Sequence, residues 1–282
     1  MSIFYAILLG IIQGLTEFIP VSSTAHLTLA GKAMGVINYD NPEEWTAFIA
    51  VIQLGSLLAV IAYFRSDILH IITGFVKANL SYVNKRPVEQ TDKTNALLGW
   101  MVIIGTIPAA VVGLAFKKQI EGVLTKDLRV ISIALIALAI VLMIAEWKGS
   151  RQRNMEHLRL SDAVIVGLAQ VFALVPGCSR SGSTITGGLF AGLTRETAAR
   201  FSFLLSIPAI GASGLLELPK ALKAVDHTIL AVATIAALLS SYATIAFLIK
   251  FLQRNSTSVF AGYRIILGLV ILVLLALGKI SA

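Results

Sequence analysis

The sequence predicts an all-α polytopic membrane protein with six transmembrane helices, two opposed re-entrant helix hairpins and an inverted-topology repeat. Of its 282 residues, 57% are hydrophobic and only 13% are charged. Six apolar stretches are near or above 18 residues, the length that crosses a hydrocarbon core of about 30 Å. Two other apolar stretches are each broken near their centre by a Pro and a cluster of hydroxyl side chains, which favours paired half-helices. We therefore expect residues 1–282 to form a single integral membrane domain.

The first half of the chain, residues 1–147, is expected to begin with a hairpin over residues 2–35, whose break lies at Pro20. A surface helix is expected at residues 67–80, within a polar connector. The three spans of this half are expected at residues 45–64, 95–116 and 128–147. Each is long enough to cross a membrane at about 1.5 Å per residue.

The second half, residues 159–282, has the same order of elements. After a charged loop, a hairpin is expected over residues 161–198, with its break beginning at Pro176. The three spans are expected at residues 199–218, 228–251 and 259–277. Because three spans per half is an odd number, the second half must be inverted, and the two hairpins would enter from opposite faces and meet near the midplane.

The distribution of charge predicts the orientation. The formal net charge is +8, which suits basic loops against anionic lipid, while the scatter of Lys and Arg over separate loops argues against nucleic acid as a partner. More Lys and Arg lie in the loops around residues 65–93, 148–159, 195–200 and 250–254 than on the opposite face. That face is therefore expected to be cytoplasmic, with both termini outside and the polar site opening to the outer, periplasmic side.

The break from Pro176 to Thr184 has the composition of an anion site. It contains Arg180 with the hydroxyls of Ser179, Ser181 and Thr184, next to the start of an apolar helix. Guanidinium, hydroxyls and the free N–H groups of a helix N-terminus suit phosphate. The alternative is that the small residues only pack helices and that Arg180 extends to the interface. A charge so far inside an apolar segment is costly, however, and usually functional.

The break around Pro20 supplies an acid. Glu17 lies deep in an apolar segment and needs a partner, for which Arg180, His26 or a divalent cation is available. Gln13 is one helical turn earlier on the same face, and two oxygens there suit Mg²⁺ or Ca²⁺, although they are too few without water or phosphate oxygens. The alternative is a structural Glu–Arg ion pair without metal.

Other polar side chains surround this acid. His26 lies three residues after Ser23, which allows it to act as a base towards Ser23 or water, or as an acid towards a leaving phosphate. A packing role for this His is the alternative. Three more candidate phosphate-binding residues are Ser22, Thr24 and, from the first span, Gln53. Gln53 would either line a polar cavity or form a hydrogen bond between helices.

An acid, a His, an Arg and several hydroxyls at the midplane are the groups that dephosphorylation requires. A transporter or flippase of polyprenyl phosphate or another anion would require much the same set. The residues alone do not separate these two functions.

Both breaks closely resemble the two signature motifs of the undecaprenyl-diphosphate phosphatase family, also called bacitracin resistance proteins. The matching segments are residues 13–26 and 176–184, and the resemblance extends over essentially the whole chain in length, span order and motif placement. It implies hydrolysis of undecaprenyl diphosphate to undecaprenyl phosphate and phosphate in the bacterial inner membrane. This reaction recycles the lipid carrier for peptidoglycan and confers resistance to bacitracin. A homodimer is left open.

The resemblance also implies roles for individual residues. Glu17, Ser23, His26 and Arg180 would form the functional core, with Ser179, Ser181 and Thr184 around the phosphate. A divalent cation, Mg²⁺ or Ca²⁺, would bind near Glu17, with Gln13 as a second candidate ligand. Two mechanisms stay open: attack by Ser23 with Glu17 or His26 accepting its proton, or attack by a water activated by Glu17 or the metal.

Overall fold

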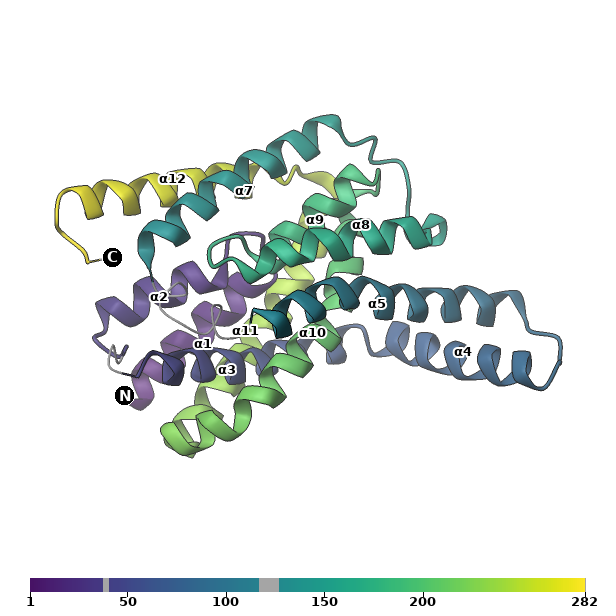
Figure 1. Ribbon diagram of the computed structural model, residues 1–282, viewed down its shortest axis with the longest axis horizontal. Coiled ribbons are helices and arrows are strands. Elements are labelled where there is room, and N and C mark those ends of the chain that lie inside the picture. Colours follow the sequence, from purple (N-terminus) through teal and green to yellow (C-terminus); the bar gives the residue numbers. More distant parts are fainter. Residues whose placement is uncertain (38–40, 117–126, 282) are drawn as a thin grey trace.

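The computed structural model describes residues 1–37, 41–116 and 127–281, and these residues form helices with no β-strand among them (Figure 1). The helices of the first half are α1 (Ile3–Glu17), α2 (Ser23–Ala33), α3 (Pro42–Tyr63), α4 (Arg65–Val83), α5 (Gln90–Ala115) and α7 (Leu128–Lys148). Those of the second half are α8 (Leu160–Val171), α9 (Arg180–Phe190), α10 (Arg195–Ala224), α11 (His227–Arg254) and α12 (Ser258–Ala276), with short 3₁₀ helices η2 (Met155–His157) and η3 (Phe172–Leu174).

Six of the described helices are long and apolar enough to cross a membrane: α3, α5, α7, α10, α11 and α12. They coincide with the six expected spans, and α4 covers the residues at which a surface helix is expected. The largest difference is α10, which extends beyond residues 199–218 at both ends. Its start is set by a cap, since the Thr194 hydroxyl accepts a hydrogen bond from the Thr197 N–H at 3.2 Å. Polar capping fixes helix ends that a hydropathy pattern cannot locate.

Two pairs of short helices contain the breaks. Helices α1 and α2 have 15 and 11 residues, and α8 and α9 have 12 and 11. At about 1.5 Å per residue, none of the four reaches across a core of about 30 Å. The second break differs in detail from expectation: α9 begins at Arg180, so Arg180 occupies the first helical turn instead of preceding the helix.

The turn before each second helix has unusual backbone geometry. Ser22, the N-cap of α2, has φ of 73°, and Ser179, the N-cap of α9, has φ of 67°. Positive φ is uncommon for a residue other than Gly and persists where the surroundings determine it. The Ser179 hydroxyl accepts a hydrogen bond from the Gly182 N–H at 3.1 Å, which ties this turn to the first turn of α9.

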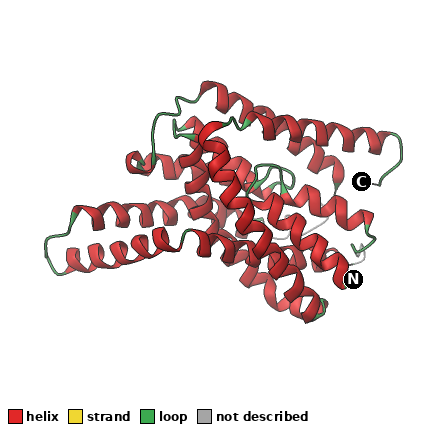
Figure 2. Ribbon diagram, turned by 180° about the vertical axis from the view of Figure 1, so that it is seen from behind, coloured by secondary structure: helices red, strands yellow, loops and turns green. Residues whose placement is uncertain are grey.

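Contacts between helix ends hold the bundle together at both ends of the molecule. At one end of the molecule, Glu146 of α7 accepts hydrogen bonds from Arg195 at the start of α10 and from Thr257 before α12. At the other end, Lys220 of α10 lies 3.7 Å from Glu43 of α3. Figure 2 shows most connecting loops at the outer ends of helices, and short loop segments near the centre with helices on several sides. Helices α4 and α5 pack on each other and extend away from the bundle (Figure 1).

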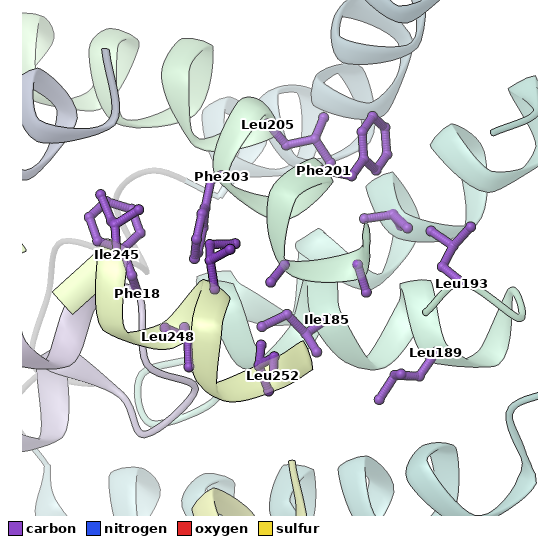
Figure 3. Close-up of a cluster of buried hydrophobic side chains, with 14 of the residues drawn as sticks. Phe18, Ile185, Leu189, Leu193, Phe201, Phe203, Leu205, Ile245, Leu248 and Leu252 are labelled. Atoms are coloured by element: carbon purple, nitrogen blue, oxygen red, sulfur yellow. The ribbon is translucent and has the colours of Figure 1, made fainter. Parts of the chain in front are cut away.

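A cluster of buried hydrophobic side chains supports the first break. It joins Phe18, directly after α1, to residues of α9, α10 and α11 (Figure 3). The Phe18 and Phe203 rings meet edge to face with centroids 5.0 Å apart, and both side chains are fully buried. Aromatic pairs of this geometry add to the free energy gained by burial. Phe18 therefore anchors the chain immediately after Glu17.

Candidate active site

Glu17 is the centre of a buried polar cluster. Its Oε1 atom accepts a hydrogen bond from Arg180 Nη2 at 3.0 Å, and its Oε2 atom accepts from Ser23 Oγ at 2.7 Å and from Gln13 Nε2 at 2.9 Å. The Glu17 and Arg180 side chains are only 4% and 13% exposed. The carboxylate therefore joins residues from both breaks, which are more than 150 positions apart in the sequence.

Ser23 and His26 are both in the first turn of α2, but they face different partners. The Ser23 hydroxyl donates to Glu17, whereas His26 Nδ1 lies 2.7 Å from the Ser22 carbonyl oxygen and His26 Nε2 lies 2.7 Å from the Tyr263 hydroxyl. A carbonyl accepts only, so Nδ1 carries a proton, and in the neutral ring Nε2 accepts from Tyr263. The group placed to take the Ser23 proton is therefore Glu17.

Arg180 is held on several sides. Its Nη1 atom donates to the Ser202 carbonyl oxygen at 3.4 Å, and its guanidinium lies 5.9 Å from the centroid of the Phe18 ring. Thr184, one turn along α9, shares a hydrogen bond with the Ser202 hydroxyl at 2.6 Å. The contacts of Arg180 with Ser202, Phe18 and Glu17 fix the direction of the guanidinium at the first turn of α9, and the positive end of a helix dipole there favours an anion.

The hydroxyls of the second break connect it to the first. Ser181 Oγ donates to the carbonyl oxygens of Glu17 at 3.1 Å and Ile19 at 3.3 Å, and it lies 3.2 Å from Ser179 Oγ. The two breaks are thus directly bonded to each other. Both serines lie within one helical turn of Arg180, as the sequence predicts.

Not every candidate residue joins this cluster. The side chains of Gln53 and Thr24 are half-buried and make no hydrogen bond within the described residues. Ser22 acts as an N-cap, since its hydroxyl accepts from the Ala25 N–H at 3.4 Å. The polar partner that α3 contributes is Ser56, which lies 3.4 Å from Gln13 Nε2 and 2.8 Å from Ser241 Oγ of α11.

Two residues of the site, both on α12, are not among the residues predicted from the sequence. Tyr263 bonds to His26, and the neighbouring Arg264 is fully buried and donates to backbone carbonyls at both breaks. Their signal was present, because Arg264 is a charge inside one of the most apolar spans, with a mean hydropathy of 2.5. A charged residue in such a segment usually faces the protein interior.

The cluster fits a divalent cation in part. Among the described residues there is no group of three or more His, Cys, Asp or Glu side chains that could hold a metal ion. Gln13 Oε1, however, is buried without a hydrogen-bond partner beside Glu17, and an amide oxygen with a carboxylate suits a hard cation. Water or phosphate oxygens would have to complete the coordination.

These features define a class of protein: a helical, multi-pass membrane protein in which two broken segments bring a carboxylate, a guanidinium and a serine hydroxyl together in a buried site. The family model described as "Bacitracin resistance protein BacA" matches residues 6–270. The chain belongs to this family of bacterial membrane proteins.

Curated relatives match over the full length. A protein of Syntrophobacter fumaroxidans is 54% identical over 95% of both chains, and one of Prosthecochloris aestuarii is 49% identical over 100% of both. One of Chlorobaculum tepidum is 48% identical over 99% of both. All three are named undecaprenyl-diphosphatase.

Proposed function

We propose that this protein hydrolyses undecaprenyl diphosphate to undecaprenyl phosphate and inorganic phosphate, which recycles the lipid carrier for peptidoglycan synthesis and confers resistance to bacitracin. The proposal rests on membership of the bacitracin resistance family and on full-length relatives that carry the name of this activity. The observation in the site that carries it is the Ser23–Glu17–Arg180 arrangement. It combines a hydroxyl, a base bonded to that hydroxyl, and a cation for the phosphoryl charge.

In the first step of the proposed mechanism, Ser23 Oγ attacks the terminal phosphorus of the diphosphate. Its proton passes to Glu17 Oε2, which already accepts the Ser23 hydrogen bond at 2.7 Å. The bond between that phosphorus and the bridging oxygen breaks, undecaprenyl phosphate leaves, and a phosphoseryl enzyme remains. Arg180 and the N–H groups at the start of α9 stabilise the charge on the equatorial phosphoryl oxygens.

In the second step, a water molecule attacks the phosphoserine. The bond between phosphorus and Ser23 Oγ breaks, and Glu17 gives its proton back to the departing Ser23 oxygen. The water keeps its protons, so dihydrogen phosphate leaves, loses a proton to solvent, and the starting enzyme is restored. The hydroxyls of Ser179 and Ser181 lie beside Arg180 and would hold the phosphate. In the alternative, water activated by Glu17 attacks the diphosphate directly and Ser23 only binds it.

A divalent cation, Mg²⁺ or Ca²⁺, would be held by Glu17 and by the free Gln13 Oε1 atom, with oxygens of the diphosphate completing its coordination. When bound, it would supply positive charge to the phosphate oxygens. The chain's own contribution is to leave this buried amide oxygen without a hydrogen-bond partner.

The two short helix pairs act as re-entrant hairpins in an inverted repeat. Three features of the packing support this: α1 packs on α11 as α8 packs on α5, α3 packs on α10, and α7 packs on α12. The α3–α10 and α7–α12 contacts join corresponding elements of the two halves, 1–147 and 159–282. The α1–α11 and α8–α5 contacts are equivalent to each other when the halves are exchanged, as a two-fold relation requires. The diphosphate would enter from the outer face while the prenyl tail stays in the lipid. A homodimer is compatible with this arrangement.

The test is phosphate release from undecaprenyl diphosphate by the purified protein in detergent, with and without EDTA. We expect release by the wild type, loss in EDTA, and radiolabelled phosphate trapped on Ser23 when the reaction is quenched. A burst of product from Ser23→Ala would exclude the covalent route. Since detergent removes any transmembrane gradient, absence of release by folded wild-type protein would contradict a phosphatase and favour a transporter.

A further inference from the structure

Arg264 of α12 is the largest fully buried side chain among the described residues. No Asp or Glu of the described chain forms an ion pair with it. Removing a guanidinium from water without a counter-charge is costly, so a buried charge of this kind is retained only where other groups compensate it. The question is which groups take the place of water around it.

The compensating groups are four backbone carbonyl oxygens from three parts of the chain. Nη1 donates to Pro20 at 3.4 Å in the first break, and Nη2 donates to Gly177 at 3.1 Å and Cys178 at 3.0 Å in the second. Nε donates to Leu135 of α7 at 3.3 Å, and α7 lies beside α12 (Figure 1). The Arg264 guanidinium therefore connects both breaks to the pair of helices α7 and α12.

Three of the four bonded carbonyls lie one or two residues before the turns at Ser22 and Ser179. Pro20 precedes Ser22, whose φ is 73°, and then the nucleophile Ser23. Cys178 precedes Ser179, whose φ is 67°, and then Arg180. A turn at positive φ in a residue other than Gly must be determined by its surroundings. Arg264 supplies such a constraint to both turns at once.

We propose that Arg264 is a positioning residue for the hydrolysis proposed above, on which this inference rests. Its guanidinium sets the distance between the Ser23–Glu17 pair of the first break and Arg180 of the second. It bonds only to backbone carbonyls and donates to no side chain of the reaction centre. A Lys ammonium would keep the charge, but its single nitrogen cannot form the planar fork that reaches both breaks.

The absence of a side chain at Gly182 supports this role independently. A Cβ atom at Gly182 would lie 2.6 Å from Arg264 Nη1, closer than atoms in real structures allow. The first turn of α9 is therefore shaped around the guanidinium. In an Arg264→Lys protein the Nη1 atom is gone, and the closest remaining contact of a methyl group at position 182 is the milder one with Ser179 Cβ at 3.2 Å.

The experiment is a double-mutant cycle with Arg264→Lys and Gly182→Ala, in which kcat and KM for undecaprenyl diphosphate are measured per folded molecule. We expect each single variant to lower kcat by about 10²-fold with little change in KM, because a displacement of about 1 Å in the reacting groups costs that much. The double variant should be no slower than Arg264→Lys alone. If Arg264→Lys does not fold, Gly182→Ala by itself still tests the prediction.

Leu230→Ala is the control, because it opens a cavity in a separate buried hydrophobic cluster that contains no residue of either break. It should lower the folded fraction but leave kcat per folded molecule unchanged. Wild-type kcat in Arg264→Lys, additive effects in the double variant, or losses confined to the folded fraction would overturn the positioning role. Failure of the wild type to release phosphate would instead overturn the proposed function together with this inference.

Discussion

At the scale of single residues, the Arg180 guanidinium is tied to Glu17 at 3.0 Å and half-surrounded by Phe18 and Ser202. Its planar shape allows it to bind a carboxylate and a phosphoryl group in fixed directions. We expect Arg180→Ala to lower kcat by at least about 10³-fold, since loss of an Arg that stabilises phosphoryl transfer has effects of this size. Arg180→Lys should still lose about 10²-fold. Near-normal phosphate release by Arg180→Lys would contradict the need for a planar guanidinium at this position.

The hydrogen bonds of Ser23 and His26 make a second prediction. Because Glu17 accepts the Ser23 hydrogen bond and His26 is bonded to Tyr263, Glu17→Gln should cost about 10²- to 10⁴-fold in kcat, the usual range for a general base. His26→Gln should cost much less and should match Tyr263→Phe, which removes the partner of His26. Single-turnover rates of the three variants provide the comparison. A His26→Gln loss as large as that of Glu17→Gln would show that His26 is the base.

At the scale of elements, the turn before α9 depends on a glycine. Gly177 has φ of 95°, and a Cβ atom there would lie 2.3 Å from the Ile131 carbonyl oxygen. We expect Gly177→Ala to destabilise the fold by about 2–4 kcal/mol, from backbone strain and overpacking together. Gly35 is the control, because its φ is 65° but nothing lies within 4 Å of the added Cβ. Gly35→Ala should cost only about 1 kcal/mol. Equal shifts in thermal unfolding would contradict the steric argument.

The positions of the helices and breaks could largely be predicted from the sequence, whereas the contacts between them could not. Hydropathy located the six spans, and the two Pro-containing breaks located Glu17, Ser23 and Arg180, because polar groups inside apolar segments are rare enough to be noticed. Hydropathy could not predict that Gln53 lies outside the polar cluster or that Ser241 bonds to Ser56. Both facts depend on which helices pack together. Hydropathy also could not predict the direction of the His26 side chain, because its partner Tyr263 is 237 positions away in the sequence.

At the scale of the whole molecule, the distribution of apolar and polar side chains is reversed relative to a water-soluble protein: large apolar side chains are exposed and charged ones are buried. Large hydrophobic residues such as Ile107, Val111 and Leu239 are more than half exposed, while Glu17 and Arg264 are buried. This pattern suits a lipid surround with a polar reaction centre inside. The prenyl tail of the substrate can then stay in lipid while only its diphosphate enters the protein.

The distribution of Lys and Arg over the loops predicts the orientation of the molecule in the membrane. Lys85, between α4 and α5, belongs to the loops richer in Lys and Arg, and His227, the first residue of α11, is expected on the opposite face. Both side chains are exposed. The positive-inside rule predicts that a membrane-impermeant maleimide labels His227→Cys in right-side-out vesicles and Lys85→Cys only in inside-out vesicles. The wild type gives the background, because its single Cys178 is buried. The reverse labelling pattern would place the basic loops outside, and the diphosphate would then have to enter from the cytoplasm.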